Sequence, residues 1–169
     1  MKRLIALIGL ILALTSCATN KDPLSSYSKA DINFAEMMIP HHEQAIEMSD
    51  IALAKSQDSE VLALATQIKN AQAPEIDQMK TWGGSHMSSH AGHMMDGMLT
   101  DEEMRALSVA AGQEFDRLFL EGMIKHHEGA IDMAEMVVDS TNQEVSRLAN
   151  AIITAQKEEI VKMKELLSR

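Results

Sequence analysis

The sequence has little of what disulfides, β-sheets and nucleic-acid binding require. Its one cysteine, Cys17, excludes a disulfide within the chain. Aromatic residues make up only 3% of the 169 residues, and there are 3 prolines and 8 glycines. With so few aromatics and so much Ala, Leu, Met, Glu and Lys, the composition predicts an all-α protein. The formal net charge of -10 at pH 7 argues against nucleic acid as a partner.

The first segment has the features of a bacterial export signal. Two basic residues precede an apolar run, Leu4 to Leu14, that is too short to span a membrane comfortably. The run leads into LTSC, which resembles a lipobox with Cys17 as the acylated first residue of the mature chain. We therefore expect a lipoprotein signal peptide at residues 1–16, a tether at 17–28 and a lipid-anchored protein facing the periplasm or cell exterior. An ordinary signal peptide and an uncleaved anchor are the alternatives.

The rest of the chain is one helical hairpin that occurs twice. A shift of 85 makes ten of the fifteen residues in Phe34–Met48 identical to the second copy. A shift of 84 makes ten of twenty residues from Val61 identical to those from Val145. Residues 29–169 are therefore predicted to form a single four-helix bundle of two hairpins. Its expected parts are repeat one at 30–81, a crossover loop at 82–100 and repeat two at 101–168.

Capping residues mark the predicted helix starts. Ser28 and Thr100 each begin a capping box and are expected to open the first helix of each half. Asp58 and Asn142 are the predicted N-caps of the second helices. Pro40 lies inside the first helix, where it is expected to kink the axis.

Each repeat carries two adjacent histidines on its first helix, in MIPHHEQAIEM and MIKHHEGAIDM. Helical spacing places His42 and His127 on the apolar stripe. It places His41 and His126 at the edge, facing the loop or a neighbouring helix. The stripes also contain further polar groups, which are Asp31, Asp116, Gln72, Glu75, Gln156 and Glu159. Burying such groups unpaired costs about 1–3 kcal/mol each, so they must pair or bind something.

Three interpretations of these buried groups are open. They could form a hydrogen-bonded network that fixes helix register. They could form a metal site, because imidazole and carboxylate together suit Zn, Cu, Fe or Mn. In a mixed site, histidine and methionine would ligate the metal while the acids support them.

The crossover loop is rich in histidine and methionine. All seven histidines of the chain lie either in this loop or in the two adjacent pairs. Imidazole and thioether together favour Cu(I) and Ag(I) where thiolates are absent. The expected loop ligands are His86, Met87, His90, His93, Met94, Met95 and Met98. An apolar flap over the bundle is the alternative interpretation.

The segments FDRLFLEGMIKHHEGAIDMA and EVSRLANAIITAQKEEIVKMKELL resemble the domain of unknown function 305 family, over nearly all of Ala30 to Leu167. The resemblance implies a ferritin-like four-helix domain in an exported protein associated with copper and silver binding and tolerance. The family motif falls on Asp31, Met38, His41, His42 and Met48, and on Asp116, Met123, His126, His127 and Met133. Lys125 departs from the usual family pattern, which Pro40 follows. The Glu-x-x-His motif of di-iron proteins is absent, which argues against a di-iron cofactor.

Together these features favour a non-enzymatic, metal-binding lipoprotein outside the cytoplasm. It would capture copper, as Cu(I) or Cu(II), or Ag(I), and sequester the ion or hand it to a copper-handling partner protein. A redox metalloenzyme with a His/carboxylate centre is the first alternative. A structural adaptor, whose histidines serve only as a core network, is the second.

Overall fold

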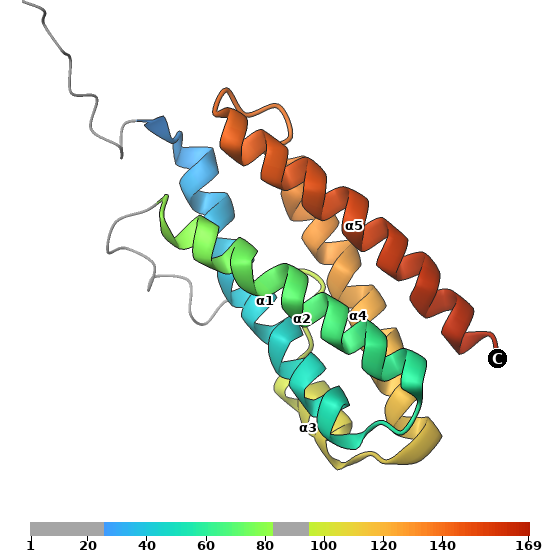
Figure 1. The fold of residues 1–169 in the computed structure, drawn as a ribbon. Helices are drawn as coiled ribbons and strands as arrows, with labels where there is room; N and C mark the ends of the chain where they lie inside the picture. Colours follow the sequence, from blue (N-terminus) through green and yellow to red (C-terminus); the bar gives the residue numbers. More distant parts are fainter. Residues whose placement is uncertain (1–25, 83–94) are drawn as a thin grey trace, which may run out of the picture.

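The computed structural model describes residues 26–82 and 95–169, which contain five helices and no strand (Figure 1). The helices are α1 (Lys29–Lys55), α2 (Ser59–Lys80), α3 (Asp101–Val109), α4 (Gly112–Glu135) and α5 (Gln143–Leu167). The all-α prediction is thus confirmed for the described residues. None of these helices is long and apolar enough to cross a membrane. The predicted signal peptide with Cys17, and loop residues His86, Met87, His90, His93 and Met94, lie outside the described residues.

Side-chain caps open α1, α2 and α5 at the residues that the sequence indicates. The Ser28 hydroxyl accepts a hydrogen bond from the Asp31 backbone N–H at 3.1 Å, and the Asp31 carboxylate accepts one from the Ser28 N–H at 2.7 Å. Asp58 and Asn142 cap α2 and α5 through backbone N–H groups of the first turn. Pro40 lies within α1, which continues past it as one helix.

The capping box at Thr100 opens a different helix from the one expected. It begins α3, which has only 9 residues, and the backbone is extended at Ala110 before α4 starts at Gly112. Gly112 has a φ of +60°, a left-handed conformation that glycine adopts without strain. The prediction of a long helix from Thr100 is therefore wrong. The second repeat consists of α4 and α5, and α3 belongs to the connection between repeats.

The four long helices pack as two hairpins. α1 packs against α2 and α4 against α5, and the hairpins meet through α1–α4 and α2–α5 contacts (Figure 1). α3 lies against α4 at one end of the bundle. The helix pair α1–α4 therefore brings the two histidine motifs, one from each repeat, to the same interface.

The core consists of two apolar clusters with polar residues between them. One cluster includes Ala45, Ile68, Met123 and Ile160, and the other includes Ile39, Ile76, Ala130 and Ile152. Between these apolar positions each long helix carries either a histidine pair or a glutamine and a glutamate. We call this set the polar layer: His41, His42, Gln72, Glu75, His126, His127, Gln156 and Glu159.

Candidate metal centre

The four motif histidines meet at the centre of the polar layer. All four have 0% of their surface exposed. The rings of His41 on α1 and His126 on α4 lie against each other, with centroids 3.7 Å apart and planes at 42°. The rings of His126 and His127 have centroids 6.3 Å apart. Helical spacing placed His41 and His126 at the edge of the stripe, but the α1–α4 contact buries them as completely as His42 and His127.

The inner histidine of each pair contacts a glutamate of the partner helix in its own hairpin. Nε2 of His42 lies 2.8 Å from Oε2 of Glu75, and Nε2 of His127 lies 2.8 Å from Oε2 of Glu159. Because a carboxylate can only accept, Nε2 donates in both pairs. The side chain of Glu75 is 18% exposed and that of Glu159 only 4%. Gln67 donates a further hydrogen bond to the buried Glu159 at 3.1 Å.

Burial favours the neutral form of three motif imidazoles, His41, His126 and His127. It lowers the pKa of His41 to about 3, helped by the neighbouring His42. Burial, and then the nearby His41, lowers the pKa of His126 well below its usual value. Burial also lowers the pKa of His127, although the hydrogen bond to Glu159 opposes it. Neutral imidazole is the form that binds metal ions, so no proton has to leave before an ion enters.

Eight of the sixteen side-chain polar atoms in this layer are buried without a hydrogen-bond partner. Both ring nitrogens of His126 are buried and unpaired, as is Nδ1 of each of the other three motif histidines. Both side-chain polar atoms of Gln72 and Oε1 of Gln156 are also unpaired. Each such atom costs about 1–3 kcal/mol. The interpretation as a self-sufficient hydrogen-bonded network therefore explains the two His–Glu pairs but not the remaining nitrogens.

Methionines lie on both sides of the polar layer. The expected ligands Met38 and Met133 belong to one apolar cluster, and Met48 and Met123 to the other. Each cluster contains one further buried methionine, Met79 or Met163. These two occupy equivalent places in the two repeats, and no motif in the sequence distinguishes them from ordinary core residues. Three buried thioethers therefore flank the layer on each side.

Asp31 and Asp116, although they share a helical stripe with the histidines, lie far from them. Each precedes the inner histidine of its helix by eleven residues, which corresponds to about 16 Å. The Ser140 hydroxyl donates to Asp31 at 2.7 Å, and the Ser56 hydroxyl donates to Asp116 at 2.6 Å. These aspartates therefore fasten the loops between paired helices and do not support the imidazoles.

The end of the crossover loop contacts His41, the outer histidine of the first repeat. We call residues 96–99 the strap. The backbone carbonyl of Asp96 lies 3.2 Å from Nε2 of His41, so this nitrogen donates to it. Gln44 holds the strap through two hydrogen bonds with Leu99, one to its carbonyl at 2.9 Å and one from its N–H at 2.8 Å. No sequence pattern predicted this contact. The loop methionines Met95 and Met98, on either side of Asp96, are half-buried.

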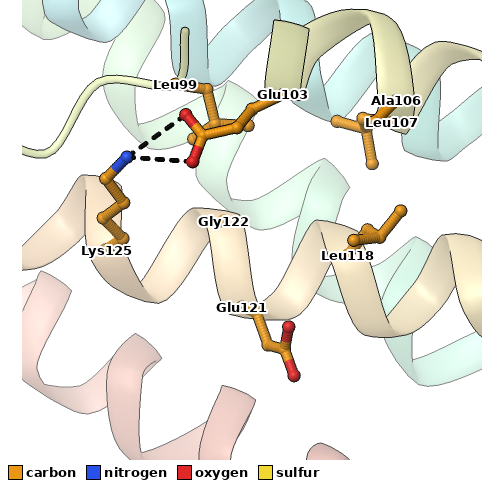
Figure 2. Close-up of a pocket in the computed structure, with 8 residues that line it drawn as sticks. All are labelled: Leu99, Glu103, Ala106, Leu107, Leu118, Glu121, Gly122 and Lys125. Atoms are coloured by element: carbon orange, nitrogen blue, oxygen red, sulfur yellow. Dashed lines mark hydrogen bonds and ion pairs between the residues drawn. The ribbon is translucent and has the colours of Figure 1, made fainter.

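Lys125, the residue that departs from the family pattern, contacts α3. Its ammonium group lies 3.2 Å from both carboxylate oxygens of Glu103, across a hollow between α3 and α4 of about 210 Å³ (Figure 2). The hollow is otherwise lined mostly by apolar side chains and contains none of the motif histidines. The lysine therefore serves the extra helix, which the first repeat lacks.

The family described as "Domain of unknown function (DUF305)" matches residues 31–167. The chain belongs to the DUF305 family. No match was found among the curated proteins.

Solved DUF305 structures share the fold of this chain. A DUF305 fragment from Deinococcus radiodurans is 34% identical, with a TM-score of 0.74 over 84% of this chain and 97% of that one. CopM in a Cu(I)-bound form is 37% identical, with a TM-score of 0.69 over 82% and 95%. CopM in an Ag-bound form is 35% identical, with a TM-score of 0.67 over 85% and 96%. CopM has also been solved in Cu(II)-bound and apo forms.

The donor atoms in the polar layer of this chain suit a soft or borderline metal ion. Within the two described segments, no three His, Cys, Asp or Glu residues converge as a ready-made ligand set. What the layer offers is two pairs of imidazoles, with the carboxylates of Glu75 and Glu159 already engaged by Nε2 of His42 and His127. Imidazole with thioether is a donor set for Cu(I) or Ag(I), whereas Mg²⁺ and Ca²⁺ need several oxygen ligands.

Proposed function

We propose that this protein binds copper, as Cu(I) or Cu(II), or silver outside the cytoplasm, without catalysing a reaction. The observation that carries the proposal is the set of five buried, unpaired ring nitrogens contributed by two repeats to one place in the core. A metal ion would pair with one lone-pair nitrogen of each ring, while the second nitrogen of a neutral His126 carries the hydrogen. The solved copper- and silver-bound forms of the related CopM support this choice of ion.

The proposed ligands follow the two histidine motifs. Nδ1 of His42 and of His127 is free because a glutamate occupies Nε2, an arrangement that orients the ring and raises its basicity. His41 and His126 supply the second pair of imidazoles. Thioethers of Met38, Met48, Met123 and Met133 are the proposed soft ligands around them. Glu75, Glu159, Gln72 and Gln156 support the ligands from the neighbouring helices.

The crossover loop is proposed as the place of first capture. Its ligands would be His86, Met87, His90, His93, Met94, Met95 and Met98. From there an ion would pass to the buried layer, or onward to a copper-handling partner protein. In this proposal residues 1–16 are a lipoprotein signal peptide, Cys17 carries the lipid and residues 17–28 tether one ferritin-like domain to the membrane.

A competition titration tests the function. The chain from Ala18 onward is titrated with Cu(I) against a competing chelator under anaerobic, reducing conditions, and the bound ions are counted. Replacing His41, His42, His126 and His127 together by alanine should remove ions from the count, because every imidazole of the layer is gone. A second variant with alanine at His86, His90 and His93 reports the loop separately.

The same titration separates the alternatives. If the layer variant binds as many ions as the wild type but melts at a lower temperature, the motif histidines are a core network and metal binding rests on the loop alone. A redox enzyme would in addition consume oxygen with Cu(I) or Fe(II) as reductant, and catalytic oxygen uptake would contradict the non-enzymatic proposal.

A further inference from the structure

The two repeats differ at a single position within the sequence HHExAI. Gln44 occupies it in the first repeat and Gly129 in the second, and both residues contact the strap. On α1, the Gln44 side chain pairs with both backbone polar groups of Leu99. On α4, the absence of a side chain at Gly129 lets the strap backbone touch the helix. The same repeat position therefore supplies a hydrogen-bonding side chain in the first half and space for the strap backbone in the second.

The approach of the strap to α4 leaves no room for a side chain. A Cβ atom at Gly129 would lie 2.2 Å from the carbonyl oxygen of Asp96 and 2.8 Å from Cα of Gly97. A Cβ atom at Gly97, whose φ is +84°, would lie 2.7 Å from the carbonyl oxygen of Lys125. The Asp96 carbonyl is thus held between the α4 backbone on one side and Nε2 of His41 on the other.

This contact decides which nitrogen of His41 carries the proton. A carbonyl oxygen can only accept, so a neutral His41 must place its hydrogen on Nε2. Nδ1 of His41 then carries the lone pair, and it is buried and unpaired. Glu75 and Glu159 impose the same choice on His42 and His127. The strap is therefore the third acceptor of a set whose other two members are glutamates.

We propose that Gln44 and Gly129 are positioning residues for metal binding: by holding the Asp96 carbonyl on His41, they fix this ring with its Nδ1 lone pair available to the ion. This inference rests on the proposed function for its metal-binding part. Neither residue touches the ion. Groups that orient a ligating histidine in this way typically change metal affinity by roughly 10–100-fold when removed.

The first test reads the proton position directly. Ring ¹⁵N spectra are recorded on metal-free protein in which His86, His90 and His93 are replaced by serine, so that only the four motif histidines remain. An added His41→Gln change identifies the His41 signals. We expect the Nε2–H form for His41, and a mixture of the two neutral forms after Gly129→Ala or Gln44→Ala. Asp132→Ala, on the same helix, is the control, because the Asp132 side chain is exposed and belongs neither to the strap nor to the proposed ligands.

The second test measures the ion. Each variant is made in protein with the natural loop sequence and titrated with Ag(I). Silver stays in one oxidation state during the titration, so the number of bound ions is not altered by redox reactions. Gly129→Ala and Gln44→Ala should keep the number of bound ions and raise the dissociation constant roughly 10–100-fold. Asp132→Ala should leave both the ion count and the dissociation constant unchanged. Circular dichroism checks that the helices persist.

The outcomes are distinct. Unchanged ring spectra in Gly129→Ala and Gln44→Ala overturn the positioning proposal, and so does a weaker affinity without a change at His41. A wild type that binds no silver or copper overturns the proposed function instead, while the ring spectra still decide whether these two residues hold His41.

Discussion

Two adjacent histidines of the second repeat should respond in opposite ways to the same substitution. His126 has two buried, unpaired ring nitrogens, and His127 donates to the buried Glu159. His126→Leu replaces a group with no partners by an apolar one of similar size. We expect metal-free protein to gain about 1–3 kcal/mol, which corresponds to a melting temperature about 3–9 °C higher for a domain of this size.

His127→Leu should destabilise the protein. It removes a hydrogen bond to a carboxylate that is 4% exposed, a loss of about 1.5–3 kcal/mol. Gln67 still donates to the other oxygen of Glu159, which keeps the loss at the lower end. The expected fall in melting temperature is about 4–6 °C.

Thermal unfolding of both variants, followed by circular dichroism in a metal-chelating buffer at pH 7.5, measures the two signs. Adding Ag(I) should then raise the melting temperature of the wild type more than that of His126→Leu, because a ligand that binds only the folded state stabilises it. If His126→Leu is as destabilised as His127→Leu, the nitrogens of His126 have partners in the metal-free protein. The inference from unpaired atoms to a metal site would then be refuted.

Three further predictions concern pH, capping and the loop. Metal-free protein should lose stability as pH falls below about 6.5, the usual histidine pKa, towards about 3, the pKa of His41, because the unfolded chain binds protons that the buried imidazoles do not. The melting temperature of the wild type should therefore fall with pH in this range. An equal fall between pH 6.5 and 5 in the variant lacking all four motif histidines would contradict the prediction. Asn142→Ala should cost about 1 kcal/mol, since it removes the side chain that caps Glu144, without changing Ag(I) affinity; chemical unfolding together with the silver titration checks both parts. In the variant that lacks all four motif histidines, replacing Met87, Met94, Met95 and Met98 by leucine should abolish the Cu(I) binding that persists at pH 5, because an imidazole of ordinary pKa is protonated there and a thioether is not; retained binding at that pH would exclude the loop methionines as its source.

Hydrophobic periodicity and the internal repeat predicted most of the fold because helix formation depends mainly on residues that are close in sequence. The repeated HH motifs, the caps at Ser28, Asp58 and Asn142 and the apolar stripes each depend on neighbours within a few turns. The capping box at Thr100 was also real, but a cap marks where a helix begins and not how far it runs. The break after Val109 depends on an extended residue and a left-handed glycine that the apolar pattern does not reveal.

The site was less accessible from the sequence because a helical wheel ignores height along the axis. Asp31 shares a stripe with His42, yet the two lie about three turns apart and bind different groups. Glu75 and Glu159 could be placed on inward faces, but only the antiparallel packing of each hairpin shows that they meet His42 and His127. The strap is a contact between residues 55 apart, and no local pattern encodes it.

Duplication within one chain allows equivalent positions of the two hairpins to carry different residues, which a dimer of one identical hairpin does not allow. A symmetric pair of identical hairpins must present the same residue at both places where Gln44 and Gly129 now stand. With glutamine at both, the second side chain would occupy the space that the backbone of Asp96 needs; with glycine at both, nothing would grip Leu99. In one duplicated chain each half has its own sequence, so the two positions can differ. The first half then binds the strap through the Gln44 side chain, and the second half accommodates the strap backbone at Gly129.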